Sequence, residues 1–241
     1  MRRHPATRFA MLPVPTAVLA LVSASLAIVS APWALDAPWL NFLFKPLTTL
    51  LIIGHARSRG LAQPLVRRWV LTGLALSLAG DVALMFASGF LPGLIAFLLA
   101  HVAYIVAFTR EHRFLAQPAA LAVYALVAGA VLALLWPSVP AGLRVPVACY
   151  VLALTAMAAQ TAVVGLRSGG ADRRRGLVLM LGGALFMTSD ALLATNRFAL
   201  LLPAATLWVL GTYWAAQWCI ASWLQPTVTR PSTATAQRPA G

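Results

Sequence analysis

The fold is decided by the stretch LALSLAGDVALMF, residues 74–86, in which a single aspartate, Asp81, stands among apolar residues. A second stretch, LGGALFMTSDALLA at residues 181–194, surrounds Asp190 in the same way. Two of the chain's five acidic residues thus lie inside apolar runs. A carboxylate in hydrocarbon costs about 3 kcal/mol or more, so it usually faces a polar interior, pairs with another group or does chemistry. The two stretches therefore predict membrane helices that carry a buried acidic dyad.

Similar apolar runs recur along the whole chain. Apolar residues make up 61% of the sequence and charged residues 10%, with a mean hydropathy of +0.85, which leaves too little polar surface for a soluble domain. A helix needs about 20 mainly apolar residues to cross a bilayer. The runs are continuously apolar rather than alternating, which argues against a β-barrel. We predict an all-α polytopic membrane protein with eight transmembrane helices, near residues 14–31, 40–55, 69–86, 90–108, 118–136, 143–166, 176–195 and 202–224.

Basic residues are divided unequally between the two sides of this predicted bundle. With the N-terminus in the cytoplasm, fifteen of the eighteen basic residues fall in cytoplasmic segments. Only Arg144 and Arg197 fall on the far side, and Lys45 lies within a span. This positive-inside bias predicts that both termini are cytoplasmic, and we expect a bacterial inner membrane. Orientation and contact with anionic lipid explain the net charge of +13, so no nucleic-acid partner is expected.

No linker divides the chain, so we expect one transmembrane helical domain over residues 1–225. The remainder, residues 226–241, is rich in Pro, Thr and Ala and is predicted to be a disordered cytoplasmic tail. The first run follows several arginines and could be a signal peptide, but the charge distribution favours an uncleaved first helix.

A faint internal repeat has an offset of 109 residues. Four helices separate its two copies, which would make it a parallel 4 + 4 repeat, although chance could also supply the matches. The matched pairs are Gly73 with Gly182, Asp81 with Asp190, and Tyr104 with Tyr213.

Polar side chains at helical spacing gather in the same layer of the membrane as the aspartates. At 1.5 Å per residue, Lys45, Asp81 and Asp190 fall at similar depth in the outer half of the bilayer. Each candidate also has a structural interpretation, because lysine can snorkel to the interface and polar side chains can hydrogen-bond between helices. The other candidates in these stripes are Ser77, His101, Tyr104, Ser189, Tyr213 and Gln217.

Several familiar catalytic motifs are absent from the sequence. It contains no GxSxG elbow, HExxH pair, nucleotide-binding glycine loop or Cys/His cluster. Cys149 and Cys219 fall within predicted spans, so neither a disulfide framework nor a metal site is expected, and no cofactor is predicted. Any catalysis must use Asp, His, Tyr and Lys side chains inside the bundle.

A series of short motifs resembles the YhhN/TMEM86 family of multispanning membrane proteins, whose characterised members are lysoplasmalogenases. The resemblance implies an eight-helix fold with Asp81 and Asp190 as catalytic residues and the polar candidates, with Asn196, as supporting or substrate-binding residues. The motifs are Lys45-Pro46-Leu47, Ser77-Leu78-Ala79-Gly80-Asp81, His101-Val102-Ala103-Tyr104, Gly183-Ala184-Leu185-Phe186 running to Ser189-Asp190, Asn196-Arg197-Phe198, and Tyr213 with Gln217.

The activity implied by this resemblance is hydrolysis of a vinyl ether. A lysoplasmalogenase cleaves a 1-alkenyl glycerophospholipid to a fatty aldehyde and a glycerophospho-alcohol. The reaction needs a general acid that protonates carbon and a group that stabilises the cation or activates water, and two carboxylates can divide these roles. Lys45 beside one aspartate would keep that carboxylate ionised. The sequence leaves open which of the two aspartates this is. The expected partners are a lysophospholipid entering from the outer leaflet and membrane lipid, in an undetermined oligomeric state.

Two other functions use intramembrane aspartates. A proton-coupled transporter of a small or lipid-like solute would suit the same pair and a parallel repeat, and it is the main alternative. An intramembrane aspartyl protease is suggested by Gly80-Asp81, but Asp190 lacks the tyrosine-aspartate context expected there.

Overall fold

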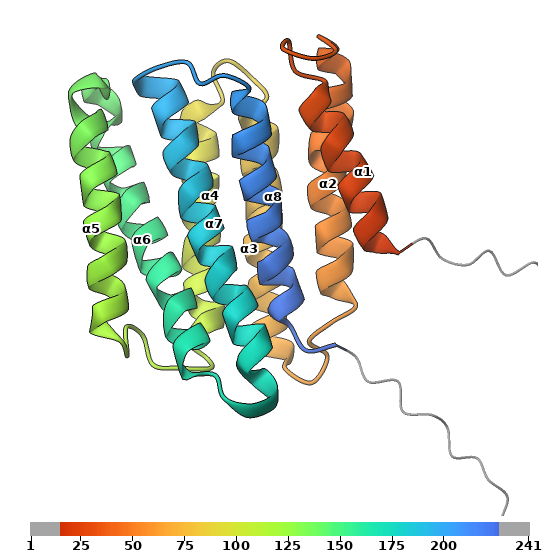
Figure 1. Cartoon of the computed structure of the whole chain (residues 1–241), viewed down its shortest axis with the longest axis vertical. Coiled ribbons are helices and arrows are strands. Elements are labelled where there is room, and N and C mark those ends of the chain that lie inside the picture. The colour runs from red at the N-terminus through yellow and green to blue at the C-terminus, as the bar shows by residue number, and fades with distance from the viewer. Residues whose placement is uncertain (1–14, 227–241) are drawn as a thin grey trace, which may run out of the picture.

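Each predicted apolar run forms a helix in the computed structural model, which describes residues 15–226 (Figure 1). Three short 3-10 segments, Trp136–Ser138, Ala141–Leu143 and Gly170–Asp172, adjoin α5, α6 and α7. Over the described residues the eight α-helices are α1 Thr16–Val29, α2 Pro38–Arg57, α3 Pro64–Ala83, α4 Phe90–Phe108, α5 Pro118–Leu135, α6 Arg144–Arg167, α7 Arg173–Phe198 and α8 Ala205–Trp223. The all-α fold class and the number of helices are thus as predicted.

Prolines explain where three of the helices begin. Pro38, Pro64 and Pro118 are the first residues of α2, α3 and α5. Proline suits this position because its missing N–H would have no partner in the helix and its φ angle is already helical. The predicted third span, 69–86, is therefore shifted toward the N-terminus. It starts at Pro64 and ends at Ala83, so Asp81 lies close to the end of its helix.

Four of the eight helices are long and apolar enough to cross a membrane by length and composition alone. They are α4, α5, α6 and α7, the last three together with their 3-10 extensions. Helix α1 is apolar but has 14 residues, while α2, α3 and α8 carry many of the polar candidates. The predicted 14–31 run is shorter here because Ser30 already lies in the turn after α1.

The helices stand side by side as an up-and-down bundle (Figure 1). Helices α7 and α8 lie in front of α3 and α4, with α5 at one edge and α1 at the other. Helix α7 packs between α6 and α8, and α4 packs between α3 and α6. Because the number of helices is even, α1 begins and α8 ends at the same end of the bundle, as the predicted topology requires (Figure 1).

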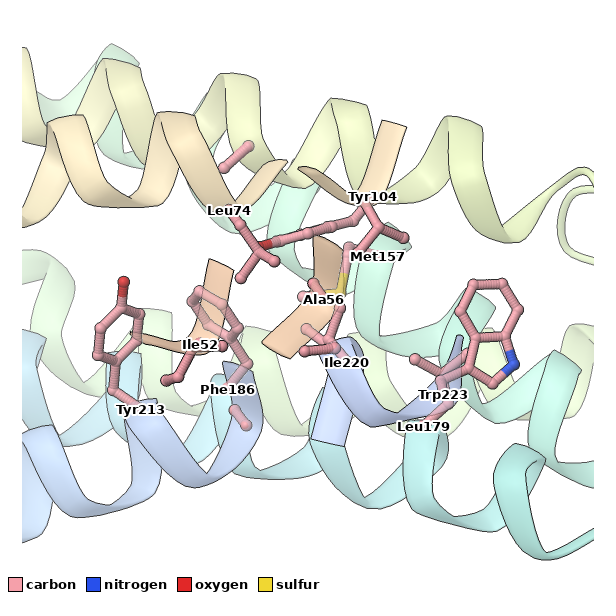
Figure 2. Close-up of a cluster of buried hydrophobic side chains, with 14 of the residues drawn as sticks. Ile52, Ala56, Leu74, Tyr104, Met157, Leu179, Phe186, Tyr213, Ile220 and Trp223 are labelled. Carbon is pink, nitrogen blue, oxygen red and sulfur yellow. The ribbon is translucent and has the colours of Figure 1, made fainter. Parts of the chain in front are cut away.

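Glycines let two helix pairs approach closely. A Cβ atom on Gly73 of α3 would lie 2.3 Å from the ring of Tyr104 on α4. On Gly183 of α7 it would lie 1.9 Å from the hydroxyl of Thr161 on α6. Small residues of this kind drive helix packing in membranes, where burial of apolar surface supplies little. Around these contacts α2, α3, α4, α6, α7 and α8 share one buried core (Figure 2).

The turn between α2 and α3 is hydrogen-bonded to the end of α8. Arg59 donates to the carbonyl oxygens of Ser222 and Leu224 at 2.9 and 3.0 Å, and the Gly60 N–H donates to Gln225 at 2.7 Å. Cations stabilise a helix C-terminus, whose last carbonyls lack partners within the helix. The predicted tail lies outside the described residues apart from Pro226, as do the first fourteen residues with their arginines.

Candidate active site

Asp81 accepts two hydrogen bonds on one carboxylate oxygen. Thr49 of α2 and Tyr213 of α8 both donate to Oδ2, each at 2.8 Å. Trp214 Nε1 in turn donates to the Thr49 hydroxyl at 3.2 Å. Asp81, Thr49 and Tyr213 are all buried, so three helices converge on a single carboxylate near the end of α3.

A line of side chains continues from Asp81 into the core. Gln217 Nε2 donates to the Tyr213 hydroxyl at 3.2 Å, and its Oε1 accepts from the Tyr104 hydroxyl at 2.8 Å. Ser77 lies at the far end, 3.5 Å from Tyr104. Four predicted supporting residues thus form one connected network, and every donor between Tyr104 and Asp81 points toward Asp81.

Asp190 is held by a pair of residues on two other helices. The Tyr150 hydroxyl of α6 donates to Asp190 Oδ2 at 2.5 Å. Because its proton is used in this way, the Tyr150 oxygen accepts from His101 Nε2 of α4, which lies 3.1 Å away. His101 Nε2 is also 3.8 Å from Asp190 Oδ2. His101 Nδ1 is buried and has no partner among the described residues.

The two aspartates therefore share one pattern of hydrogen bonds. In each case a tyrosine hydroxyl donates to the carboxylate and accepts an N–H, from Gln217 at one site and from His101 at the other. Both aspartates lie about 26 Å from the start of their helices at 1.5 Å per residue, which places them at similar depth. No hydrogen bond joins them, and aromatic rings separate the two networks.

These rings come from α4, α7 and α8. Phe186 contacts the rings of His101 and Tyr213 edge-on, with centroids 4.8 and 5.6 Å apart. Phe97 contacts Phe186 and Tyr213 in the same geometry. Phe186 is fully buried at the centre of the cluster drawn in Figure 2. The rings thus pack between the Tyr213 network and His101 of the Asp190 network.

Both aspartates open onto one polar cavity of about 490 Å³. Lys45 lines it from α2, and its electrostatic partner is Asp81. The Lys45 side chain is buried, which does not fit snorkelling to an interface. Six of the nine polar residues that line this cavity are predicted site residues: Lys45, Asp81, Ser189, Asp190, Asn196 and Tyr213. The other three are Asn41, Arg197 and Thr206.

A second space, the apolar groove, also has a volume of about 490 Å³. It runs between α5, α6 and α7, with Phe90, Leu94 and Phe97 of α4 forming its inner wall. Its lining is almost wholly hydrocarbon, and Tyr150 and Asp190 are among its few polar residues. Asp190 lines both spaces, as do four apolar residues, so it lies where the apolar groove adjoins the polar cavity.

Two predicted site residues make mainly structural contacts. Ser189 donates to the Val209 carbonyl of α8 at 2.9 Å, which ties α7 to α8. Asn196 Oδ1 accepts from the Leu202 N–H at 2.9 Å and shapes the loop between those helices. Both also line the polar cavity.

The main residue that sequence reasoning missed is Tyr150. It occupies an apolar stretch of α6 where a tyrosine is easily taken for a packing residue. The sequence feature that could have identified Tyr150 is the rarity of tyrosine. The chain has four tyrosines, and three of them form hydrogen bonds within the two networks. Within residues 15–226, no three His, Cys, Asp or Glu side chains gather closely enough to hold a metal ion.

Comparison with known proteins gives consistent matches over most of the chain. The sequence model of the YhhN family matches residues 40–224. The chain is 34% identical over 184 residues to "Lysoplasmalogenase TMEM86B" of Homo sapiens, covering 74% of this chain and 73% of that protein. It is 33% identical over 193 residues to "Lysoplasmalogenase TMEM86A" of Homo sapiens, covering 76% and 77%. "Lysoplasmalogenase TMEM86B" of Sus scrofa is 33% identical over 183 residues, covering 76% and 74%. No solved structure matches.

Proposed function

This chain belongs to the YhhN family, and from that premise we propose that it is an integral membrane hydrolase that cleaves the vinyl ether bond of lysoplasmalogens. The products are a fatty aldehyde and a glycerophospho-alcohol. The observation that carries the proposal is the position of Asp190, which lines both the polar cavity and the apolar groove. A vinyl ether joins the hydrocarbon chain of such a lipid to its polar glycerol, so the reacting bond belongs at such a boundary.

The surroundings of the two carboxylates suggest how they divide the reaction. Asp81 receives two O–H donors and lies near Lys45, and both features stabilise its charged form. Asp190 receives one donor and borders the apolar groove, where a carboxylic acid is better accommodated than a carboxylate. We therefore assign Asp190 as the general acid and Asp81 as the general base.

The proposed reaction begins with proton transfer from Asp190 to the alkenyl carbon next to the one that bears oxygen. This carbon gains a C–H bond, and the electron pair of the double bond leaves an oxocarbenium ion. Water attacks the cationic carbon while Asp81 accepts its proton. The resulting hemiacetal collapses to the aldehyde and the free glycerol hydroxyl, and the proton on Asp81 returns to Asp190 through the cavity that both line.

The membrane arrangement that accompanies this function uses all eight helices as spans. Both chain ends would lie in the cytoplasm of a bacterium with the protein in its inner membrane, and the polar cavity would lie toward the outer leaflet. Support comes from the distribution of arginines in the sequence and from the even number of helices.

The test is aldehyde release from a 1-alkenyl lysophospholipid by protein purified in detergent. We expect Asp81→Asn and Asp190→Asn each to lower kcat by at least about 100-fold, because general acid–base groups contribute on that scale. Asp36→Asn, in the exposed loop between α1 and α2, is the matched control and should keep full activity. In D₂O the aldehyde should carry one deuterium on the carbon next to the carbonyl.

Near-normal turnover in either site variant, with folding intact, would contradict the assignment of the aspartates. The transporter alternative predicts a different result for the same set of proteins. It would be favoured if the wild type released no aldehyde but took up protons in liposomes, and if that uptake depended on both aspartates.

A further inference from the structure

We propose that the apolar groove is the binding site for the single hydrocarbon chain of the substrate, and that it selects lipids by chain length. This inference rests on the proposed function, because it places the chain relative to the reacting bond at Asp190. The groove adjoins the polar cavity, and Asp190, Phe90 and Phe97 are part of both walls. A molecule with one apolar chain and one polar head would therefore fill both spaces with its linking bond at the carboxylate.

The volume of the groove suits one lipid chain. Along α7 its lining extends about 9 Å from Asp190 to Ala184 and about 12 Å from Asp190 to Phe198, at 1.5 Å per residue. A volume of about 490 Å³ also lies within the range of ~300–1,000 Å³ typical of ligand pockets.

The polar residues fix the direction in which the lipid lies. Arg197 and Asn196, near the C-terminal end of α7, line the polar cavity together with Lys45. An anionic phosphate would be attracted to the positive charges of Arg197 and Lys45. Ala184 lies about 9 Å along α7 on the other side of Asp190, in the apolar groove. The head group therefore lies toward the loop between α7 and α8, and the chain runs past Asp190 toward Ala184.

The edge position of α5 offers a route from the bilayer. Helix α5 stands at the margin of the bundle, packed against α6 and α7 (Figure 1). Val127, on its groove side, is 48% exposed. A lipid already in the membrane can therefore enter beside α5 without crossing water. Leu126 is 75% exposed and is absent from the groove lining, so it marks the face of α5 turned away from the site.

These two adjacent residues provide matched variants. Val127→Trp would place an indole in the groove, while Leu126→Trp would place the same group on the outer face. The probe is a 1-alkyl lysophosphatidylcholine with a diazirine near the end of its chain, whose saturated ether cannot be hydrolysed as a vinyl ether. In wild type and Leu126→Trp, we expect photolabelling of α5 to α7 peptides that unlabelled lysolipid displaces. In Val127→Trp, this labelling should fall at least fivefold.

A second measurement compares hydrolysis of 1-alkenyl lysolipids with 16-carbon and 8-carbon chains. The ratio of their kcat/KM values should fall about tenfold in Val127→Trp and stay unchanged in Leu126→Trp. Equal labelling of the two variants, or an equal loss of activity at both chain lengths, would overturn the proposal and show that the groove holds only bulk lipid. If the wild type labels in the groove but releases no aldehyde, the chain site stands and the proposed hydrolysis fails.

Discussion

At the scale of single residues, the two aspartates have similar hydrogen-bond partners but different surroundings. Each accepts from a tyrosine, yet Asp81 has Thr49 and Lys45 beside it, whereas Asp190 has the apolar groove. A buried carboxylate that accepts from fixed donors keeps one orientation, because any other would leave those donors without partners. In the proposed reaction, the tyrosines would therefore position the two carboxylates before a substrate arrives.

Tyr150 gives the sharpest residue-level prediction. Tyr150→Phe removes the 2.5 Å hydrogen bond to Asp190 but keeps the ring. Proton transfer to the substrate leaves Asp190 as a carboxylate, and a hydrogen bond to a charged group contributes about 1.5–3 kcal/mol. Loss of this bond should therefore lower kcat about 10- to 100-fold with KM within twofold. Steady-state kinetics of the purified variant measure this split.

The control for this variant is Tyr124→Phe. Tyr124 lines the same groove from α5 and has no hydrogen bond among the described residues, so kcat should stay at the wild-type value. A rise in KM with unchanged kcat in Tyr150→Phe would instead assign Tyr150 to substrate binding and remove it from the acid's support.

At the scale of helices, the approach of α3 and α4 depends on Gly73. Gly73→Ala would drive a methyl group against the ring of Tyr104, which is fully buried and bonded to Gln217. Overpacking of this kind costs about 1–3 kcal/mol, so the thermal midpoint in detergent should fall by several degrees.

Gly129→Ala is the matched change on α5, where no atom lies within 4 Å of the added methyl group. Alanine is a better helix former than glycine, so this variant should be as stable as the wild type or slightly more so. An equal loss of stability in both variants would show that the close contact at Gly73 is not the cause.

Helix positions were predictable because an uninterrupted apolar stretch long enough to cross a bilayer is typical of a transmembrane helix. Their boundaries shifted where proline set the start, as at Pro64. Which helices become neighbours was not predictable, since a helix such as α5 is apolar on nearly all faces and carries no directional pattern. Asp190 was conspicuous because a charge stands out in an apolar run. Tyr150, its partner, was missed because only the pairing of α6 with α7 gives it a role.

At the scale of the whole molecule, the order of helices requires that alternate loops lie at the same end of the bundle. Among the described residues, the three arginines outside the helices are Arg59, Arg110 and Arg113, in the loops before α3 and α5. Three more begin α7 at the same end of the bundle, where α1 starts and α8 ends (Figure 1). Reporter fusions within residues 168–172 and in the C-terminal tail should therefore both report cytoplasm, while one near Ser138 should report the far side. A far-side signal from the tail would contradict a bundle of eight spans.

The internal repeat stays a prediction at this scale. The pairs α3–α4 and α7–α8 are both closely packed hairpins, and each first helix carries its aspartate at the same distance from its start. The hydrogen bonds do not follow the repeat, however. Tyr213 of α8 donates to Asp81, but its counterpart Tyr104 donates to Gln217 and not to Asp190.

The hydrogen bonds between the α2–α3 turn and the end of α8 join early and late parts of the chain, which matters for biogenesis. Ribosomes make α2 and α3 early, so Lys45 and Asp81 enter the membrane long before Tyr213 and Gln217 are synthesised. Until α8 arrives, Asp81 lacks its tyrosine donor, and Arg59 has no helix end to hold. Asp81 therefore has an incomplete set of hydrogen bonds until the last helix is inserted, and the proposed catalytic centre is complete only when α8 docks against α2.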